Sequence, residues 1–200
     1  MNILRAISEA EMIAEFLKAE YLSERFSEQI KEAMDALSLS ESIILSADLR
    51  NADENNARKN LLGEFRGYGL NRELFERFPT EITWSLCNFV NGDLKNIRYI
   101  DYSYWNELSQ GTRSPFTAAQ TILNGIEIYE QSNEGFVKAA KFLKDDGKFL
   151  RTILLTSDFE HFVIVEGHLR MTAYALVPEC FNNVECFVGK CIDSDLRKWL

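Results

Sequence analysis

The chain has 200 residues, of which 46% are hydrophobic and 12% aromatic, so it can bury a core and is not disordered in composition. Its formal net charge of -9 disfavours binding to DNA and to an anionic membrane surface, because both carry phosphate charge. The N-terminus lacks the apolar run of a signal peptide, and no window is long enough to span a membrane. We therefore expect a cytoplasmic protein without a membrane partner.

The expected N-terminal elements are mainly helical. Apolar side chains recur at helical spacing over residues 9–37, and Ser8 followed three positions later by Glu11 has the pattern of a capping box. Residues 50–56 are polar and predict a loop. A further helix is expected to end at Gly67, because glycine favours the left-handed conformation that terminates helices.

A turn signal at Asn91-Gly92-Asp93 follows an apolar stretch that fits a helix or a strand equally well. We place a boundary there, between an N-terminal helical region, residues 1–92, and a core, residues 93–200. In the core, strands are expected at residues 97–102, 152–155, 162–165 and 184–188, and helices at 117–126 (with Thr117 as N-cap), at 134–144, at 168–176 and after Asp193. This order predicts an α+β fold with a small mixed sheet and flanking helices.

The four cysteines are Cys87, Cys180, Cys186 and Cys191. Their spacings match neither a CxxC pair nor a usual zinc pattern. We interpret them as reduced, buried thiols that act as small hydrophobic side chains. A disulfide or a metal site is the less favoured alternative.

The most informative stretch joins a strand to a helix. The β-branched run Val163-Ile164-Val165 leads to Glu166, and Gly167 allows a tight turn before the next helix starts. The first N–H groups of a helix have no intrahelical partner and carry partial positive charge, so they bind anions. His168 and Arg170 add donors on the same turn, and a guanidinium can contact a phosphate through two parallel hydrogen bonds. The sequence therefore predicts a phosphate site here.

Taken in order, these motifs resemble the ParB/sulfiredoxin superfamily over residues 97–191. The matching boxes are a strand, the arginine-bearing loop Gly111-Thr112-Arg113-Ser114-Pro115, helices, the strand Thr152-Ile153-Leu154-Leu155-Thr156, the stretch Val163 to Tyr174 and the closing strand Val184-Glu185-Cys186-Phe187-Val188. The pattern acidic-Gly-His-x-Arg looks most like the free-serine-kinase and nuclease-like branches. ParB proteins carry Gly-Glu-Arg-Arg at this point, and sulfiredoxins carry a reactive cysteine where Gly167 stands, so CTP-gated clamping and sulfinic-acid repair are disfavoured.

The resemblance implies a nucleotide-binding protein that uses ATP, ADP or CTP together with magnesium. It implies that Glu166 holds the metal and that Glu166 and His168 act in catalysis. The residues it implies for contact with the nucleotide are Gly167, His168, Arg170, Arg113 and Thr112. The corresponding reaction is phosphoryl transfer to an unidentified small-molecule or macromolecular acceptor, or nucleotide hydrolysis.

The same residues also have structural interpretations. Glu166 can complement the helix dipole, His168 can hydrogen-bond a loop, and Arg113 can be an ordinary surface arginine. Two other functions therefore stay open. One is a non-catalytic module in which the nucleotide switches binding to DNA or protein, with DNA disfavoured by the acidic charge. The other is an inert scaffold that retains the fold alone.

Overall fold

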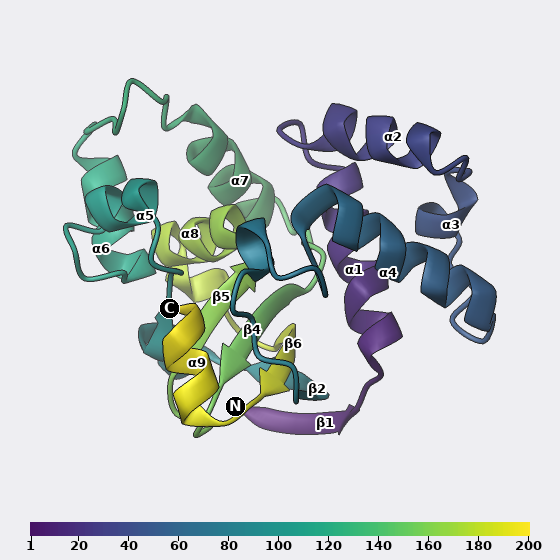
Figure 1. The fold of residues 1–200 in the computed structure, drawn as a ribbon. Helices are drawn as coiled ribbons and strands as arrows, with labels where there is room; N and C mark the ends of the chain where they lie inside the picture. Colours follow the sequence, from purple (N-terminus) through teal and green to yellow (C-terminus); the bar gives the residue numbers. More distant parts are fainter.

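The computed structural model describes all 200 residues and is built around one six-stranded mixed sheet. Its strands are β1 (Asn2–Ala6), β2 (Thr83–Phe89), β3 (Ile97–Arg98), β4 (Thr152–Thr156), β5 (Phe162–Glu166) and β6 (Val184–Lys190), in the order β1-β2-β6-β4-β5-β3. Strands β4 and β6 are parallel, as are β3 and β5, and the other neighbours are antiparallel. Figure 1 shows the sheet between two groups of helices. The α+β class with a mixed sheet is confirmed.

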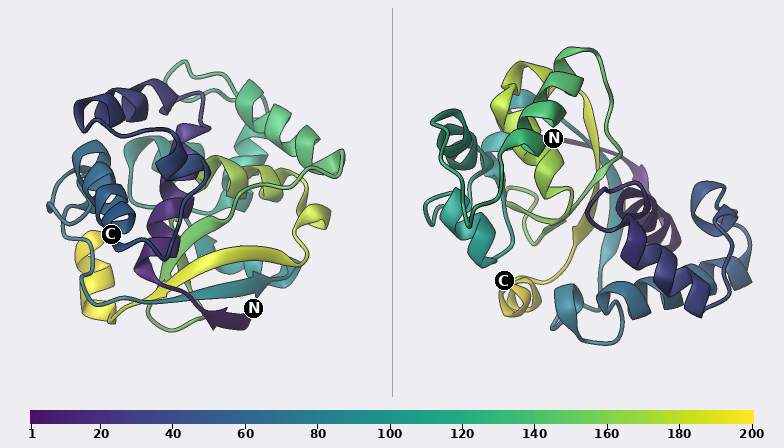
Figure 2. Two further views of the ribbon diagram at one scale, coloured as in Figure 1. Left: turned by 90° about the vertical axis from the view of Figure 1, so that its right-hand side faces the viewer. Right: turned by 90° about the horizontal axis from the view of Figure 1, so that it is seen from above.

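The central strands are buried on both faces. Successive side chains of a strand point to opposite faces, and the two hydrophobic clusters of the protein follow this alternation. Ile153 and Leu155 of β4 belong to the cluster that includes the N-terminal helices, whereas Leu154 belongs to the cluster that includes the helices of the second half. Figure 2 shows the two helical groups on opposite sides of the sheet. This double coverage explains why β4 and β5 read as continuous apolar runs.

The N-terminal helices are α1 (Glu9–Tyr21), α2 (Ser27–Ala36), α3 (Ser42–Leu45) and α4 (Ala52–Arg66). The capping box is confirmed, since the Glu11 amide donates to Ser8 Oγ and the Ser8 amide donates to Glu11 Oε2. A single helix over residues 9–37 was expected and is wrong. The chain breaks between Tyr21 and Ser27. Helix α1 shares a hydrophobic cluster with the sheet and packs on α4, and α2 turns back to pack across both α1 and α4.

Two further expectations concern α4. The predicted loop at residues 50–56 is wrong from Ala52 onward, because Asn51 caps α4 by accepting from the amides of Asp53 and Glu54. The predicted stop at Gly67 is confirmed, with φ +86°. A Cβ at Gly67 would lie 2.1 Å from the Arg72 carbonyl oxygen, so no other residue fits this turn.

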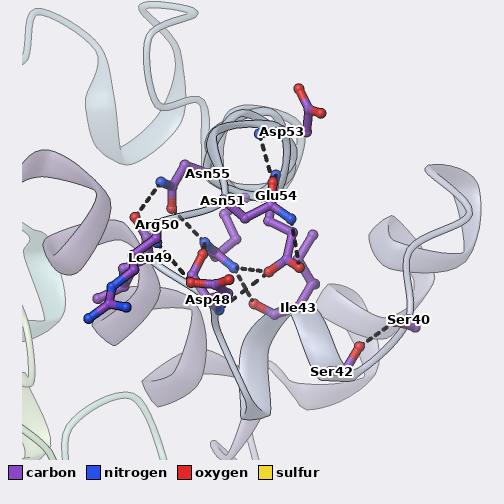
Figure 3. Close-up of polar contacts among 11 residues, drawn as sticks. Ser40, Ser42, Ile43, Asp48, Leu49, Arg50, Asn51, Asp53, Glu54 and Asn55 are labelled. Carbon is purple, nitrogen blue, oxygen red and sulfur yellow. Dashed lines mark hydrogen bonds and ion pairs between the residues drawn. The ribbon is translucent and has the colours of Figure 1, made fainter.

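A fully buried arginine, Arg58, holds the segment between α3 and α4. Its guanidinium donates to the carbonyl oxygens of Ile43 and Asp48 at 3.0 and 2.9 Å and pairs with Glu54 at 3.2 Å. Figure 3 shows these partners, with Asn55, converging on one point. The side chain therefore satisfies backbone groups that helix hydrogen bonds leave unpaired.

The sheet continues across the predicted boundary at residue 92. Strands β1 and β2 come from the expected N-terminal helical region and join β6, so residues 1–92 also contribute to the sheet. The stretch that fitted a helix or a strand forms β2. The division into residues 1–92 and 93–200 stays a prediction.

The helices of the second half are α5 (Ser103–Leu108), α6 (Pro115–Leu123), α7 (Glu134–Lys144), α8 (His168–Leu176) and α9 (Asp193–Trp199). The chain also has three short 3-10 helices, which are η1 (Glu73–Phe75), η2 (Asn91–Asn96) and η3 (Pro178–Cys180). The helices predicted at 134–144 and 168–176 are confirmed. Thr117 is not an N-cap, because α6 starts at Pro115 after Ser114. The strand expected at 97–102 stops at Arg98, where the Tyr99 amide turns to donate to the Arg113 carbonyl. None of the helices is long and apolar enough to cross a membrane.

Candidate anion site at the start of helix α8

Strand β5 passes directly into α8 through Gly167. This glycine has φ +102°, and a Cβ on it would lie 2.7 Å from Thr152 Oγ1 and 2.9 Å from Arg170 Nη2. The position therefore needs glycine for both its backbone angle and its crowding. No side chain caps α8 at its N-terminus. The first-turn amides therefore have no side-chain acceptor, and the phosphate site expected here stays a prediction.

His168 opens α8 within an aromatic stack. Its ring lies 4.9 Å from the ring of Trp105 and 5.9 Å from that of Tyr99, with interplanar angles of 18° and 19°. Its Nε2 atom is shielded from solvent and has no hydrogen-bond partner. Burial, reinforced by the positive charges of Arg66 and Arg25, lowers the pKa of His168 to about 3. The imidazole is therefore neutral at pH 7 and can offer one hydrogen bond but no charge.

Arg170 turns back beneath Gly167. Its guanidinium forms an ion pair with Glu166, and Nη2 also donates to the Arg151 carbonyl at 3.3 Å. Burial lowers the pKa of Arg170 to about 10, against the charges of Glu15 and Glu20, so the group remains positive at neutral pH. Its Nε is shielded and unpartnered.

The two first-turn side chains have different surroundings. His168 contacts aromatic rings from the β3–α5 segment, whereas Arg170 contacts Glu166 and the backbone of Arg151. The sequence predicted that both side chains add donors to one phosphate site, but the two side chains share no partner. The structure has a hollow of about 370 Å³ between α1, α3 and Arg151, and another of about 420 Å³ beside β2 and the end of β6. Neither hollow is lined by His168 or Arg170.

Arg113 and Thr112 lie in the loop between α5 and α6. Arg113 Nε donates to the Tyr99 carbonyl at 2.8 Å, and the Arg113 amide donates to Ser109 Oγ at 2.9 Å. Thr112 Oγ1 donates to the Ser109 carbonyl at 2.7 Å. These contacts shape the loop and position Tyr99, the ring beside His168. The pKa of Arg113 is lowered, mainly by burial.

Three residues near α8 were missed by the sequence reasoning: Glu20, Arg25 and Arg66. Arg66 Nη1 lies 3.7 Å from Glu20 Oε1. The guanidinium groups of Arg66 and Arg25 lie over the Phe26 ring, 4.7 and 4.9 Å from its centroid. Burial raises the pKa of the Glu20 carboxyl, which is opposed by Arg66, then Arg170 and Arg25. In the sequence these residues look like part of a solvated helix face, so no local signal could have identified them.

The metal role of Glu166 stays a prediction. Its carboxylate pairs with Arg170, and it does not belong to a group of potential ligands. The residues close enough to share an ion are Asp158, Glu160 and His161, on the exposed turn between β4 and β5. Asp158 Oδ1 already accepts from the amides of Glu160 and His161, both at 2.8 Å, so it shapes that turn.

No known family model matches the chain. No curated protein and no solved structure is detectably similar to it. The resemblance to the ParB/sulfiredoxin superfamily consequently stays a prediction from the motifs, and the functional argument depends on the geometry at α8.

Proposed function

We propose that the protein binds the phosphates of a nucleotide at the N-terminus of α8. The observation that carries the proposal is a helix start without a side-chain cap that lies within the electrostatic reach of two arginines from the N-terminal helices. In a chain with a net charge of -9, a local group of cations favours an anionic ligand.

The cations of this site come from both halves of the chain. Arg25 is exposed and makes no ion pair, and Arg66 reaches its only carboxylate partner, Glu20, at 3.7 Å. Glu20 is buried, which disfavours its charged form, so it compensates the two guanidiniums poorly. An incoming phosphate would supply the missing negative charge and accept hydrogen bonds from the amides of α8.

The aromatic rings beside the helix suit the rest of a nucleotide. Trp105 is partly buried and stacks on His168, while Tyr104 packs edge-on against Trp105 with ring centroids 5.0 Å apart. Aromatic surface of this kind binds nucleobases by stacking. The resemblance of the motifs favours ATP, ADP or CTP, with magnesium carried by the phosphates.

The ion pair between Glu166 and Arg170 favours binding without catalysis. A carboxylate held by an arginine beneath the helix is a weak base and is poorly placed to hold magnesium. We therefore propose a nucleotide-binding module that engages a macromolecular partner. The second candidate is a magnesium-dependent phosphotransferase or nucleotide hydrolase, in which the bound phosphates displace Glu166 from Arg170.

The test is a thermal-shift and calorimetric panel of ATP, ADP and CTP, each with and without magnesium. A ligand at 100 times its Kd is expected to raise the Tm by roughly 5–10 °C. Arg25→Gln should remove most of this shift without unfolding the protein, because Arg25 is exposed, and Arg50→Gln serves as the matched control on another exposed arginine. A panel without any shift, or an equal shift in Arg25→Gln, refutes the proposal.

The same samples distinguish the two candidates. Phosphate release is expected to stay at background with every nucleotide, with or without magnesium. Turnover that needs magnesium and disappears in Glu166→Gln would instead establish the catalytic alternative.

A further inference from the structure

Two of the four cysteines lie side by side on adjacent strands of the sheet. Cys87 of β2 is the register partner of Cys186 of β6 in the antiparallel pair. Both thiols are free and fully buried, and both side chains belong to the same hydrophobic cluster, so they lie on the same face. The sequence shows two cysteines 99 positions apart, and only the strand pairing brings them together.

Partner positions in antiparallel strands suit the geometry of a disulfide. Directly opposed residues in antiparallel strands have Cα atoms about 4.5–5.5 Å apart, and disulfides join Cα atoms about 4.4–6.8 Å apart. The other two cysteines differ, because Cys180 and Cys191 donate weak hydrogen bonds at 3.8 Å to the carbonyls of Leu143 and Thr156. No other cysteine pair occupies partner positions in adjacent strands.

We propose that Cys87 and Cys186 form an oxidative modification site, at which a hydroperoxide converts the two thiols into a disulfide between β2 and β6. The thiolate of one cysteine attacks hydrogen peroxide, which gives a sulfenic acid and hydroxide; the hydroxide takes up the proton that the thiol lost and leaves as water. The thiol of the other cysteine then attacks that sulfur, so that the S–S bond forms and a second water leaves. The two thiols lose two electrons in total, and hydrogen peroxide accepts them. This site is independent of the nucleotide proposal.

Oxidation at this site is limited by opening of the sheet. Burial raises the pKa of Cys87 to about 11 and raises that of Cys186 further, with the neighbouring thiol as an added cause, so little thiolate exists at neutral pH. Strand β2 is covered at its outer edge only by β1, whose five residues are all exposed. Separation of β1 from β2 would uncover the edge of β2 at Cys87, which is the register partner of Ile3.

The disulfide would change the stability of the whole fold. It closes a loop of about one hundred residues that joins a strand before residue 92 to a strand near the C-terminus. Such a crosslink restricts the unfolded chain, and the expected rise in Tm is roughly 10 °C. Reduction reverses the effect.

The experiment treats the full chain with hydrogen peroxide and follows thiol content, intact mass and Tm. We expect loss of two of the four titratable thiols, a crosslinked peptide that contains Cys87 and Cys186, a raised Tm, and reversal by dithiothreitol. Low urea, below the unfolding transition, should accelerate the reaction because it increases opening. The double variant Cys180→Ala/Cys191→Ala should behave like the natural sequence.

Three outcomes would overturn the proposal. They are retention of all four thiols even in low urea, a crosslink that involves Cys180 or Cys191, and oxidation that stops at sulfinic acid without a crosslink. Cys87→Ala and Cys186→Ala are each expected to abolish the crosslink. If one of these core variants fails to fold, the peptide map of the natural sequence still decides the matter.

Discussion

Protonation of His168 is expected to destabilise the fold as the pH falls from 8 to 5. The native pKa of His168 is about 3 because of burial and the charges of Arg66 and Arg25, whereas an unfolded histidine titrates near 6.5. The unfolded chain therefore binds more protons below pH 6.5, and the free energy of unfolding decreases until the pH reaches the native pKa. One pKa unit corresponds to about 1.4 kcal/mol, so the complete effect is about 5 kcal/mol, of which about 2 kcal/mol appears by pH 5.

The assay is urea unfolding at pH 8, 7, 6 and 5 for the natural sequence and for His168→Phe, which keeps an aromatic ring beside Trp105. The variant should lose about 2 kcal/mol less than the natural sequence between pH 8 and pH 5. The only other histidine, His161, lies on an exposed turn beside Asp158, so the His161→Gln variant, measured in parallel, separates its contribution from that of His168. Equal pH dependence of the natural sequence and His168→Phe would refute the burial of a neutral imidazole.

Three further substitutions test the structure. Arg58→Met should destabilise the protein by about 2–4 kcal/mol in urea unfolding, because the buried Ile43 carbonyl and the partly buried Asp48 carbonyl lose their donor, and a loss below 1 kcal/mol would contradict that role. Gly167→Ala should cost at least about 2 kcal/mol and weaken nucleotide binding, because φ is +102° and the Cβ meets Thr152; an unchanged Tm would argue against the turn. Ser8→Ala should cost about 1 kcal/mol through the lost cap of α1, and Ser46→Ala, which removes no cap, should not.

Some elements were predictable because their signals are local. The start of α1 follows from Ser8 and Glu11, and the end of α4 follows from Gly67, since capping geometry involves only residues a few positions apart. The succession of β5, Gly167 and α8 was predictable for the same reason. A β-branched apolar run, a glycine and a helical period of 3.6 meet there within a single short stretch.

Other elements depended on contacts between distant parts of the chain. Strand β2 is apolar on both faces, and periodicity cannot distinguish such a strand from a buried helix. The break between α1 and α2 arises where the chain turns back so that α2 packs across α1 and α4, and local propensity does not encode those contacts.

For the candidate site, the sequence by itself determined the helix start, its glycine and the residues on its first turn. Only the tertiary structure decided where those side chains go, with His168 in an aromatic stack and Arg170 on Glu166. It also decided that Arg25 and Arg66, which lie more than one hundred residues earlier in the chain, act on His168. The physical reason is that backbone geometry is fixed by neighbours in sequence, whereas burial and charge pairing are fixed by neighbours in space. Those spatial neighbours exist only once the sheet has brought both halves together.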